Sequence, residues 1–245
     1  MAELGTRAGM RVVEFDHRDV GTPEAYWSPL LAGLPRIDPC AVSGPVVVVS
    51  PHPDDEVLAA GGTVQCLVLA GAVVTVISLT DGEAADPGDP SLGGIRSAEL
   101  RSAVDRLGLA SIEIVRLGFG DGRLASVPPE HLSASIERVG GPAATWIGPL
   151  PDDGHPDHEA AGRATMRVAA RTGARLWQYA VWAWHWGRDV DLPLARAVRI
   201  DLDELVLARK RRAIEAFRSQ TTGADAILNA HVRSRFERPF EVFFT

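Results

Sequence analysis

The feature of this sequence that most constrains its fold is a regular alternation of short β-branched runs with longer amphipathic segments. The run Val46–Val49 is typical of a strand that is buried on both faces, as strands of parallel sheets are. Short links join each such run to a segment with helical periodicity, which predicts right-handed crossover connections. We therefore expect an α/β protein with a Rossmann-like three-layer fold, a mostly parallel sheet, and an active site at the carboxyl ends of the strands.

The alternation can be followed from residue 46 to the end of the chain. Strands are predicted over 46–49, 73–79, 112–117, 144–147, 175–182 and 197–201. Helices are predicted over 24–31, 56–70, 95–107, 129–139, 157–171 and 203–217. The tail over 236–244 alternates weakly, and we expect it to form an edge strand.

Length and composition favour one domain. A chain of 245 residues with 46% hydrophobic and 23% charged residues can build a single α/β core without disulfide bonds. We expect residues 1–245 to form that domain, with an irregular N-terminal lead-in over 1–44 and the core over about 45–222. Only two cysteines are present, so a disulfide framework is excluded.

The net charge of -7 would repel a phosphate backbone, which argues against nucleic acid as a partner. The N-terminal segment lacks the apolar stretch of a secretory signal, and glycines interrupt the longest apolar run. We therefore expect a cytoplasmic protein with no membrane partner, and we leave a homo-oligomer open.

The first candidate site directly follows the first buried strand. His52, Asp54, Asp55 and Glu56 place one imidazole and three carboxylates within five residues. Zinc binds histidine nitrogen and carboxylate oxygen, and a catalytic zinc keeps one position open for water. One turn can bring His52 and Asp55 to a single ion, with Asp54 between them facing the water. The alternative is that Asp54 or Asp55 only caps the following helix.

A second candidate site follows the predicted strand over 144–147. His155 and His158 are three residues apart, so they lie on the same side of one helical turn. His158 can complete a His/Asp/His metal site with His52 and Asp55. His155 can then stand beside the ion as a positively charged hydrogen-bond donor.

Together, Pro51–Glu56 (PHPDDE) and His155–His158 (HPDH) resemble the paired signatures of the PIG-L/LmbE family. The resemblance covers about residues 45–222. In one departure, Phe217-Arg218 stands near a point where many relatives carry a histidine. Weaker pieces agree with the family pattern: Gly61-Gly62, Thr80–Glu83, Arg96 with Glu99, Gly118–Gly122, Lys210, Ala213 and Ser219-Gln220.

The resemblance implies a zinc-dependent N-deacetylase or amidase that acts on N-acetylglucosamine conjugates, which are small molecules. It implies one Zn²⁺ per chain, and other divalent metals would also suit the donors. By the same resemblance, His52, Asp55 and His158 are the ligands, Asp54 is the general base, and His155 is the electrophilic or acid partner. The acyl group is expected to be acetyl.

Further residues are candidates for binding the sugar. Arg96 and Asp121 are expected in loops at the active edge, where charged groups suit sugar hydroxyls. In the cluster Val181–Trp186, either Trp184 or Trp186 is expected to line a pocket, because indole faces stack on sugar rings, and His185 is expected to reach a ligand.

Other functions remain open. A related amidase that removes a larger acyl group, or a tailoring deacetylase of a natural product, would show the same motifs. A nucleotide-binding Rossmann protein is disfavoured, because the turn after the first strand presents carboxylates where phosphate would bind. A non-catalytic sugar-binding module would have no need of Asp54.

Overall fold

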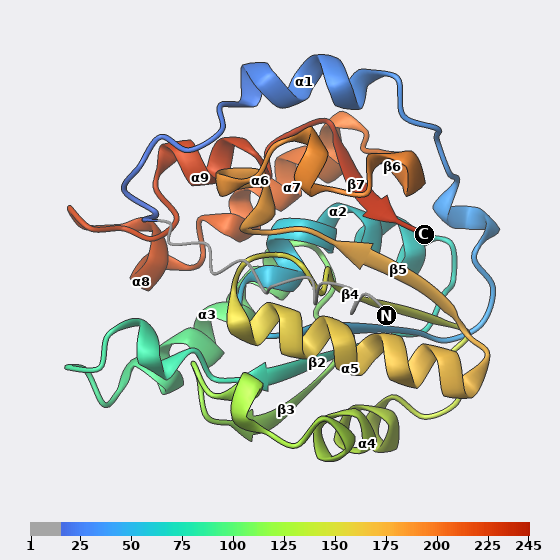
Figure 1. Cartoon of the computed structure of the whole chain (residues 1–245), viewed down its shortest axis with the longest axis horizontal. Coiled ribbons are helices and arrows are strands. Elements are labelled where there is room, and N and C mark those ends of the chain that lie inside the picture. The colour runs from blue at the N-terminus through green and yellow to red at the C-terminus, as the bar shows by residue number, and fades with distance from the viewer. Residues whose placement is uncertain (1–15) are drawn as a thin grey trace, which may run out of the picture.

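The structure is a computed structural model that describes residues 16–245. Helices cover both faces of one seven-stranded sheet, which confirms the predicted three-layer α/β fold (Figure 1). The part of the N-terminal lead-in before residue 16 lies outside the described residues. The strands are β1 (Val46–Ser50), β2 (Val74–Thr80), β3 (Glu113–Phe119), β4 (Thr145–Pro149), β5 (Arg175–Tyr179), β6 (Ala197–Asp201) and β7 (Phe240–Phe244).

The six predicted helices all occur in the predicted order, and the described residues also form three short helices that were not predicted, α6, α8 and α9. Two predicted elements end early: the strand over 175–182 stops at Tyr179, and the helix over 203–217 breaks after Ile214. The α-helices are α1 (Glu24–Ala32), α2 (Asp55–Leu69), α3 (Leu92–Arg106), α4 (Pro129–Gly140), α5 (Pro156–Thr172), α6 (Ala183–Trp186), α7 (Glu204–Ile214), α8 (Arg218–Thr221) and α9 (Ala230–Ser234).

Strand β1 is buried along its whole length, and its side chains alternate between two cores. Val46 and Val48 pack in the core that includes residues of α2, α3 and α7. Val47 and Val49 pack in the core that includes residues of α4 and α5. A β-branched residue at every position fits a strand that has no solvent-facing side, so the valine run places β1 in the middle of the sheet.

Two functional loops meet beside β1. The strand order is β3-β2-β1-β4-β5-β7-β6, and β1 pairs in parallel with both β2 and β4. The chain passes from β1 to β2 and β3 on one side, and it then crosses to β4 on the other side of β1. In parallel sheets a crevice opens at the carboxyl ends of the strands where the order reverses in this way. The loops after β1 and β4, which carry the two histidine motifs, border this crevice.

The prediction that the C-terminal tail forms an edge strand is wrong. β7 lies between β5 and β6 and is antiparallel to both, and β6 is the edge strand. Phe243 and Phe244 are fully buried, and they pack against the rings of Trp177 and Trp184 respectively. Aromatic residues on both faces mark an internal strand, and this signal outweighs the weak alternation.

The buried carboxylate of Glu241 joins β7 to the helices α2 and α7. Glu241 accepts hydrogen bonds from the backbone nitrogens of Gly62 at 2.8 Å and Thr63 at 2.7 Å, within α2. The ammonium of Lys210 lies 2.7 Å from the same carboxylate. The negative charge is thus met by three donors, and the position of α2 is fixed relative to the sheet.

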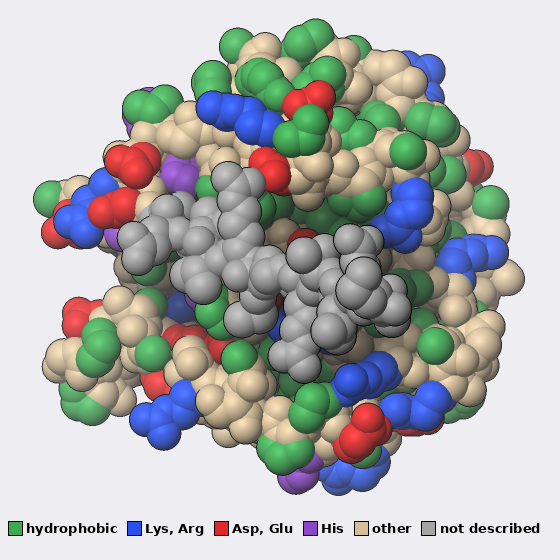
Figure 2. Space-filling view, viewed as in Figure 1, with side chains coloured by type: hydrophobic (Ala, Val, Ile, Leu, Met, Phe, Trp, Pro, Cys, Tyr) green, Lys and Arg blue, Asp and Glu red, His purple; other side chains and the backbone are tan. Residues whose placement is uncertain are grey.

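On the face drawn in Figure 2, basic and acidic side chains are interspersed around the grey atoms. An exposed ion pair joins Arg171 on α5 to Glu137 on α4 at 2.6 Å. Among residues 16–245, we find no helix whose length and apolar character would let it span a lipid bilayer.

Candidate metal centre and catalytic cavity

Three side-chain atoms converge beyond the end of β1. His52 Nδ1 lies 3.2 Å from His158 Nε2, and Asp55 Oδ2 lies 3.3 Å from each of these nitrogens. His52 and Asp55 come from the loop after β1 and the first turn of α2, and His158 comes from the first turn of α5. All three residues are buried.

This triangle of atoms has the dimensions of a metal site. Ligand atoms about 2.0–2.1 Å from a tetrahedral zinc ion are about 3.3 Å apart. Two imidazole nitrogens in contact also need a proton or a cation between them, because each presents a lone pair to the other. A mixed nitrogen and carboxylate set suits Zn²⁺, so the residues fit the ion that the resemblance implies.

The electrostatics of the three groups also favour a cation between them. Burial by itself would lower the pKa of His158, but the carboxylates of Asp55 and Asp153 raise it to about 9. Burial would raise the pKa of Asp55, but both histidines hold it below its usual range. The group therefore retains positive charge near neutral pH, and a metal ion would displace protons to bind.

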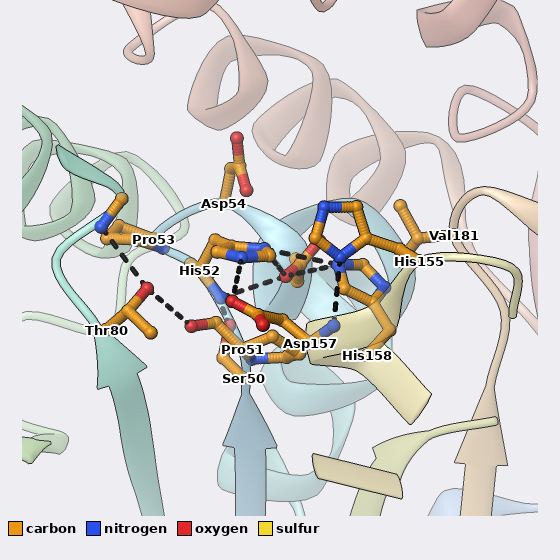
Figure 3. Close-up of polar contacts among 12 residues, drawn as sticks. Ser50, Pro51, His52, Pro53, Asp54, Thr80, His155, Asp157, His158 and Val181 are labelled. Carbon is orange, nitrogen blue, oxygen red and sulfur yellow. Dashed lines mark hydrogen bonds and ion pairs between the residues drawn. The ribbon is translucent and has the colours of Figure 1, made fainter. Parts of the chain in front are cut away.

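His155 also reaches this group, so a second donor set must be considered. Its ring nitrogen lies within 4.8 Å of donor atoms of His52 and His158. However, His155 Nδ1 accepts a hydrogen bond from the backbone nitrogen of Asp157 at 3.2 Å. That contact leaves Nε2 as the nitrogen that carries the proton. Figure 3 shows the three imidazole rings gathered together, with Asp54 standing apart from them.

Asp153 orients His158 from the side opposite the triangle. Its Oδ2 atom lies 2.8 Å from His158 Nδ1, and the residue is fully buried. The same carboxylate accepts from the backbone nitrogens of Val181, Trp182 and Ala183. A carboxylate behind a metal-binding histidine fixes the tautomer and raises the basicity of the ring. These contacts also explain why β5 ends at Tyr179: the next residues turn to meet Asp153.

We expect Asp153→Asn to lower zinc affinity by about tenfold to a hundredfold, the usual effect of removing such a partner. Asparagine can still accept from the backbone nitrogens of Val181 and Ala183, which both donate to Oδ1, so the fold should be retained. Zinc affinity is measured by competition with a chelator, and thermal unfolding of the metal-free protein is the control. Unchanged zinc affinity would show that Asp153 acts on packing alone.

The other ring nitrogen of His52 faces two carboxylates. Nε2 lies 3.1 Å from Asp121 Oδ1 and 3.4 Å from Asp157 Oδ2. Asp157 also accepts from the backbone nitrogens of Gly122 and Leu124, which fastens the loop after β3 to α5. Burial would raise the pKa of Asp121, but its hydrogen bond with His52 lowers that pKa to about 2. Both carboxylates thus accept the Nε2 proton while Nδ1 faces the triangle.

Glu56, the third carboxylate of the motif, points away from the triangle. Ser50 Oγ lies 2.5 Å from Glu56 Oε2 and 2.6 Å from the carbonyl oxygen of His52. The carbonyl can only accept the single hydroxyl proton, so Glu56 must itself be protonated and donate to Ser50. Burial raises the pKa of Glu56 to about 8, which agrees with that assignment. The chain of bonds holds the main chain at His52 in place.

Asp54 does not cap the helix that follows it. Its side chain makes no capping hydrogen bond with α2, and its Oδ2 atom lies 2.9 Å from Arg96 Nη2. Burial raises the pKa of Asp54 to about 6, although Arg96 acts in the opposite direction. A carboxylate with a pKa near neutrality, at the wall of a cavity, suits proton transfer better than capping.

His155 is neutral in this environment. Burial lowers its pKa to about 3, and the neighbouring charges of His158 and His52 act in the same direction. The neutral ring differs from the positively charged donor that we expected. Burial disfavours the charged form of the ring, and the positive charges of His158 and His52 oppose a further proton on His155. His155 can still donate a hydrogen bond from Nε2 as a neutral imidazole.

The candidate centre opens into a cavity of about 250 Å³. Asp54 and His155 both line it, together with His52 and Asp55. Its lining combines charged side chains with apolar ones. The remaining lining residues are Leu58, Ala84, Ala85, Arg96, Asp121, Gly122, Val181, Trp182, Gln220, Ile227 and Leu228.

Of the predicted substrate residues, Arg96 and Asp121 line the cavity, but both are already paired with catalytic-site groups. The other three predicted residues do not line this cavity. Trp184 is buried against Trp27, and Trp186 donates its indole proton to the carbonyl of Asp153. His185 lies 3.1 Å from the carbonyl oxygen of Asp16.

The indole at the cavity is that of Trp182, which the sequence analysis assigned to a strand. Because β5 stops at Tyr179, Trp182 turns out of the sheet and reaches the cavity. Asp153 and Asp157 were not singled out either. Asp157 lies inside the second motif and Asp153 lies two residues before it, so acids close to metal-binding histidines were the available signal.

Comparisons with known proteins agree on the family of this chain. The sequence model of the PIG-L family, described as GlcNAc-PI de-N-acetylase, matches residues 47–169. A Bacillus cereus protein named "Probable N-acetyl-alpha-D-glucosaminyl L-malate deacetylase 2" is 34% identical over 140 residues, 51% of this chain and 61% of that protein. The "1D-myo-inositol 2-acetamido-2-deoxy-alpha-D-glucopyranoside deacetylase" of Tsukamurella paurometabola is 32% identical over 181 residues, 58% of this chain and 61% of that protein. The matches thus span about three fifths of the length of these curated relatives.

Solved structures share the fold. A conserved protein from Thermus thermophilus aligns with a TM-score of 0.62 and 27% identity, over 82% of this chain and 93% of that one. The N,N'-diacetylchitobiose deacetylase of Pyrococcus horikoshii aligns with a TM-score of 0.63 and 21% identity, over 92% of this chain and 94% of that one.

Proposed function

The chain belongs to the PIG-L family, and on that premise we propose that it is a zinc-dependent N-deacetylase of a small N-acetylglucosamine conjugate. The observation that carries the proposal is the triangle of His52, Asp55 and His158 donor atoms, with the carboxylate of Asp54 at the same cavity. Three protein ligands leave a position open for water and substrate, as a catalytic zinc site requires.

Zinc, when bound, would polarise the amide carbonyl and lower the pKa of a coordinated water from about 15.7 to about 7. The residues of the chain supply the proton transfers. Asp54 accepts the proton of the attacking water, which is the role its raised pKa suits. His155 donates from Nε2 to the oxygen on which negative charge develops. The protonated Asp54 is then available to give its proton to the departing nitrogen.

The substrate class follows from the relatives. Both curated relatives are named as deacetylases of an N-acetylglucosamine unit joined to a small polar group. We extend that activity to this chain and take acetyl as the acyl group. The amidase with a larger acyl group remains the competing candidate, and the apolar wall formed by Leu58, Val181 and Leu228 would favour it.

The test measures release of free amine from a panel of substrates by purified, zinc-loaded protein. The panel holds N-acetylglucosamine joined to inositol, malate or an alkyl group, and the matching N-butanoyl and N-octanoyl compounds. We expect one zinc per chain and higher kcat/KM on the acetyl than on the longer compounds. Preference for the longer acyl groups would favour the amidase, and absence of turnover across the panel with zinc bound would refute the proposal.

Two further expectations accompany this function. The cytoplasmic location and the possibility of a homo-oligomer stay predictions from the sequence. Fractionation of the producing cells and light scattering of the purified protein would test them.

A further inference from the structure

We propose that Glu99 is a positioning residue that holds Ser219 at the start of α8 and thereby orients the side-chain amide of Gln220 in the cavity. The inference rests on the proposed function, because the effect we expect is on binding of the conjugate. Glu99 lies on α3, next to α8 (Figure 1), and it is 120 residues from Ser219 in the sequence. Neither of these two residues belongs to the metal triangle or lines the cavity, so both act at one remove from the substrate.

Helix α8 depends on contacts from outside itself. It has only four residues, and a helix this short does not hold its shape alone. Its N-cap residue, Phe217, supplies no side-chain cap. The backbone nitrogen of Ser219 lies in the first turn, where no helical carbonyl is available to accept from it. Glu99 Oε1 accepts this hydrogen bond at 2.8 Å, so the carboxylate caps α8 from a neighbouring helix.

The hydrogen bonds of the Ser219 hydroxyl fix the orientation of the Gln220 amide. Ser219 Oγ lies 2.6 Å from Glu99 Oε2 and 3.0 Å from Gln220 Nε2. A carboxylate can only accept, so Ser219 donates its single proton to Glu99. Ser219 Oγ must then accept from Gln220, and only the NH2 group of an amide can donate. The NH2 group of Gln220 therefore faces Ser219.

This orientation decides which atom Gln220 offers to a ligand. Gln220 lines the cavity, and the described residues give its Oε1 atom no hydrogen-bond partner. An oxygen at this point can accept from a donor on the conjugate, whereas with the amide reversed that donor would meet another donor. The carbonyl oxygen of Gln220 also accepts from the backbone nitrogen of Leu228 at 2.8 Å, and Leu228 lines the same cavity. Glu99 thus acts on two lining residues through Ser219.

The test compares zinc-loaded wild type with Glu99→Gln, Ser219→Ala and the double variant, on the N-acetylglucosamine conjugate of the panel that wild type cleaves best. Glu99→Gln keeps the shape of the side chain but puts an NH2 group in place of one of its two acceptors. KM should rise about threefold to tenfold, the effect of one lost hydrogen bond. The value of kcat should change less than about twofold, and zinc content should remain at one ion per chain.

The double variant shows whether Glu99 acts through Ser219. Its KM should equal that of Ser219→Ala, because without the hydroxyl one acceptor at residue 99 is enough for the backbone nitrogen. Glu137→Gln is the matched control. It makes the same chemical change in the exposed ion pair with Arg171, away from the cavity lining, and should leave both KM and kcat at wild-type values.

Other outcomes would overturn the proposal. Wild-type KM in Glu99→Gln would show that the contact does not reach the substrate, and multiplied KM effects in the double variant would show that Glu99 acts independently of Ser219. Parallel losses of kcat and zinc content would show a general structural role. If Glu99→Gln does not fold, Ser219→Ala carries the test: raised KM at wild-type kcat supports the proposal, and unchanged KM refutes it.

A second readout does not depend on deacetylation. In the metal-free protein, the Tm shift of the double variant should be smaller than the sum of the two single shifts, because both single variants break the same contact. Additive Tm shifts would refute the contact between Glu99 and Ser219. If wild type cleaves no conjugate, the proposed function fails, while this cycle still reports on the pair.

Discussion

His158→Ala is expected to abolish both zinc binding and turnover. His158 supplies one of three donor atoms, and it is fully buried at the start of α5. With two ligands left, the site no longer holds the ion at a catalytic geometry, and water at the site would not be activated. We expect zinc content to fall from one ion per chain to near zero, and kcat/KM to fall by more than about a thousandfold. Elemental analysis and amine release measure the two effects.

A control separates loss of the metal from loss of the fold. His131→Ala removes an exposed histidine on α4 that contacts the ring of Phe119. This histidine belongs neither to the triangle nor to the cavity lining. It should keep wild-type zinc content and activity. Thermal unfolding of metal-free His158→Ala should remain cooperative, since Asp153 keeps its three backbone donors. Stoichiometric zinc of native affinity in a folded His158→Ala protein would refute the ligand assignment.

The layers of the fold were predictable because strong local patterns agree with the tertiary structure. The valine run of β1 has no polar side, and burial on both faces is the only arrangement that satisfies it. The tail was mispredicted for the opposite reason. Whether β7 lies at an edge or inside the sheet depends on partners more than 30 residues away in sequence, and periodicity carries no information about them.

The same distinction applies to the candidate site. The residues of the two short motifs come together because each motif begins a helix at a strand end, and neighbouring parallel strands end at the same edge. The substrate wall was harder to predict. Trp182 lines the cavity where the chain after β5 meets Asp153, and Arg96 lines it while it pairs with Asp54 from another loop. Contacts of this kind join residues that are far apart in the sequence, so no short motif with a fixed spacing contains both partners.

The site also shows how two adjacent acids acquire different roles. Asp55 lies in the first turn of α2, and its carboxylate turns back to accept from the backbone nitrogen of His52 at 3.0 Å. Asp54 precedes the helix, and its strained backbone sends the carboxylate toward Arg96 instead. Two histidines hold the pKa of Asp55 below its usual range, whereas burial raises that of Asp54. Environments that separate two pKa values mark a division into ligand and base.

Asp54→Asn is expected to keep zinc and substrate affinity while losing turnover. The Asp54 carboxylate is not one of the three donor atoms, so zinc content should remain at the wild-type value. Asparagine has nearly the same shape, and its carbonyl oxygen can still accept from Arg96. An amide cannot take a proton from water, however, so kcat should fall by about a hundredfold to ten-thousandfold with little change in KM.

Asp55→Asn is the matched variant, because it makes the same chemical change one residue along the chain. It should weaken zinc binding, since a neutral amide oxygen replaces a charged ligand, and added zinc should recover part of its activity. Added zinc should not restore the activity of Asp54→Asn. If Asp54→Asn instead turns over at the wild-type rate with zinc in place, Asp54 is not the base. His155 is then the next candidate, because it lines the cavity and is not a proposed ligand, and the same measurements on His155→Gln would test it.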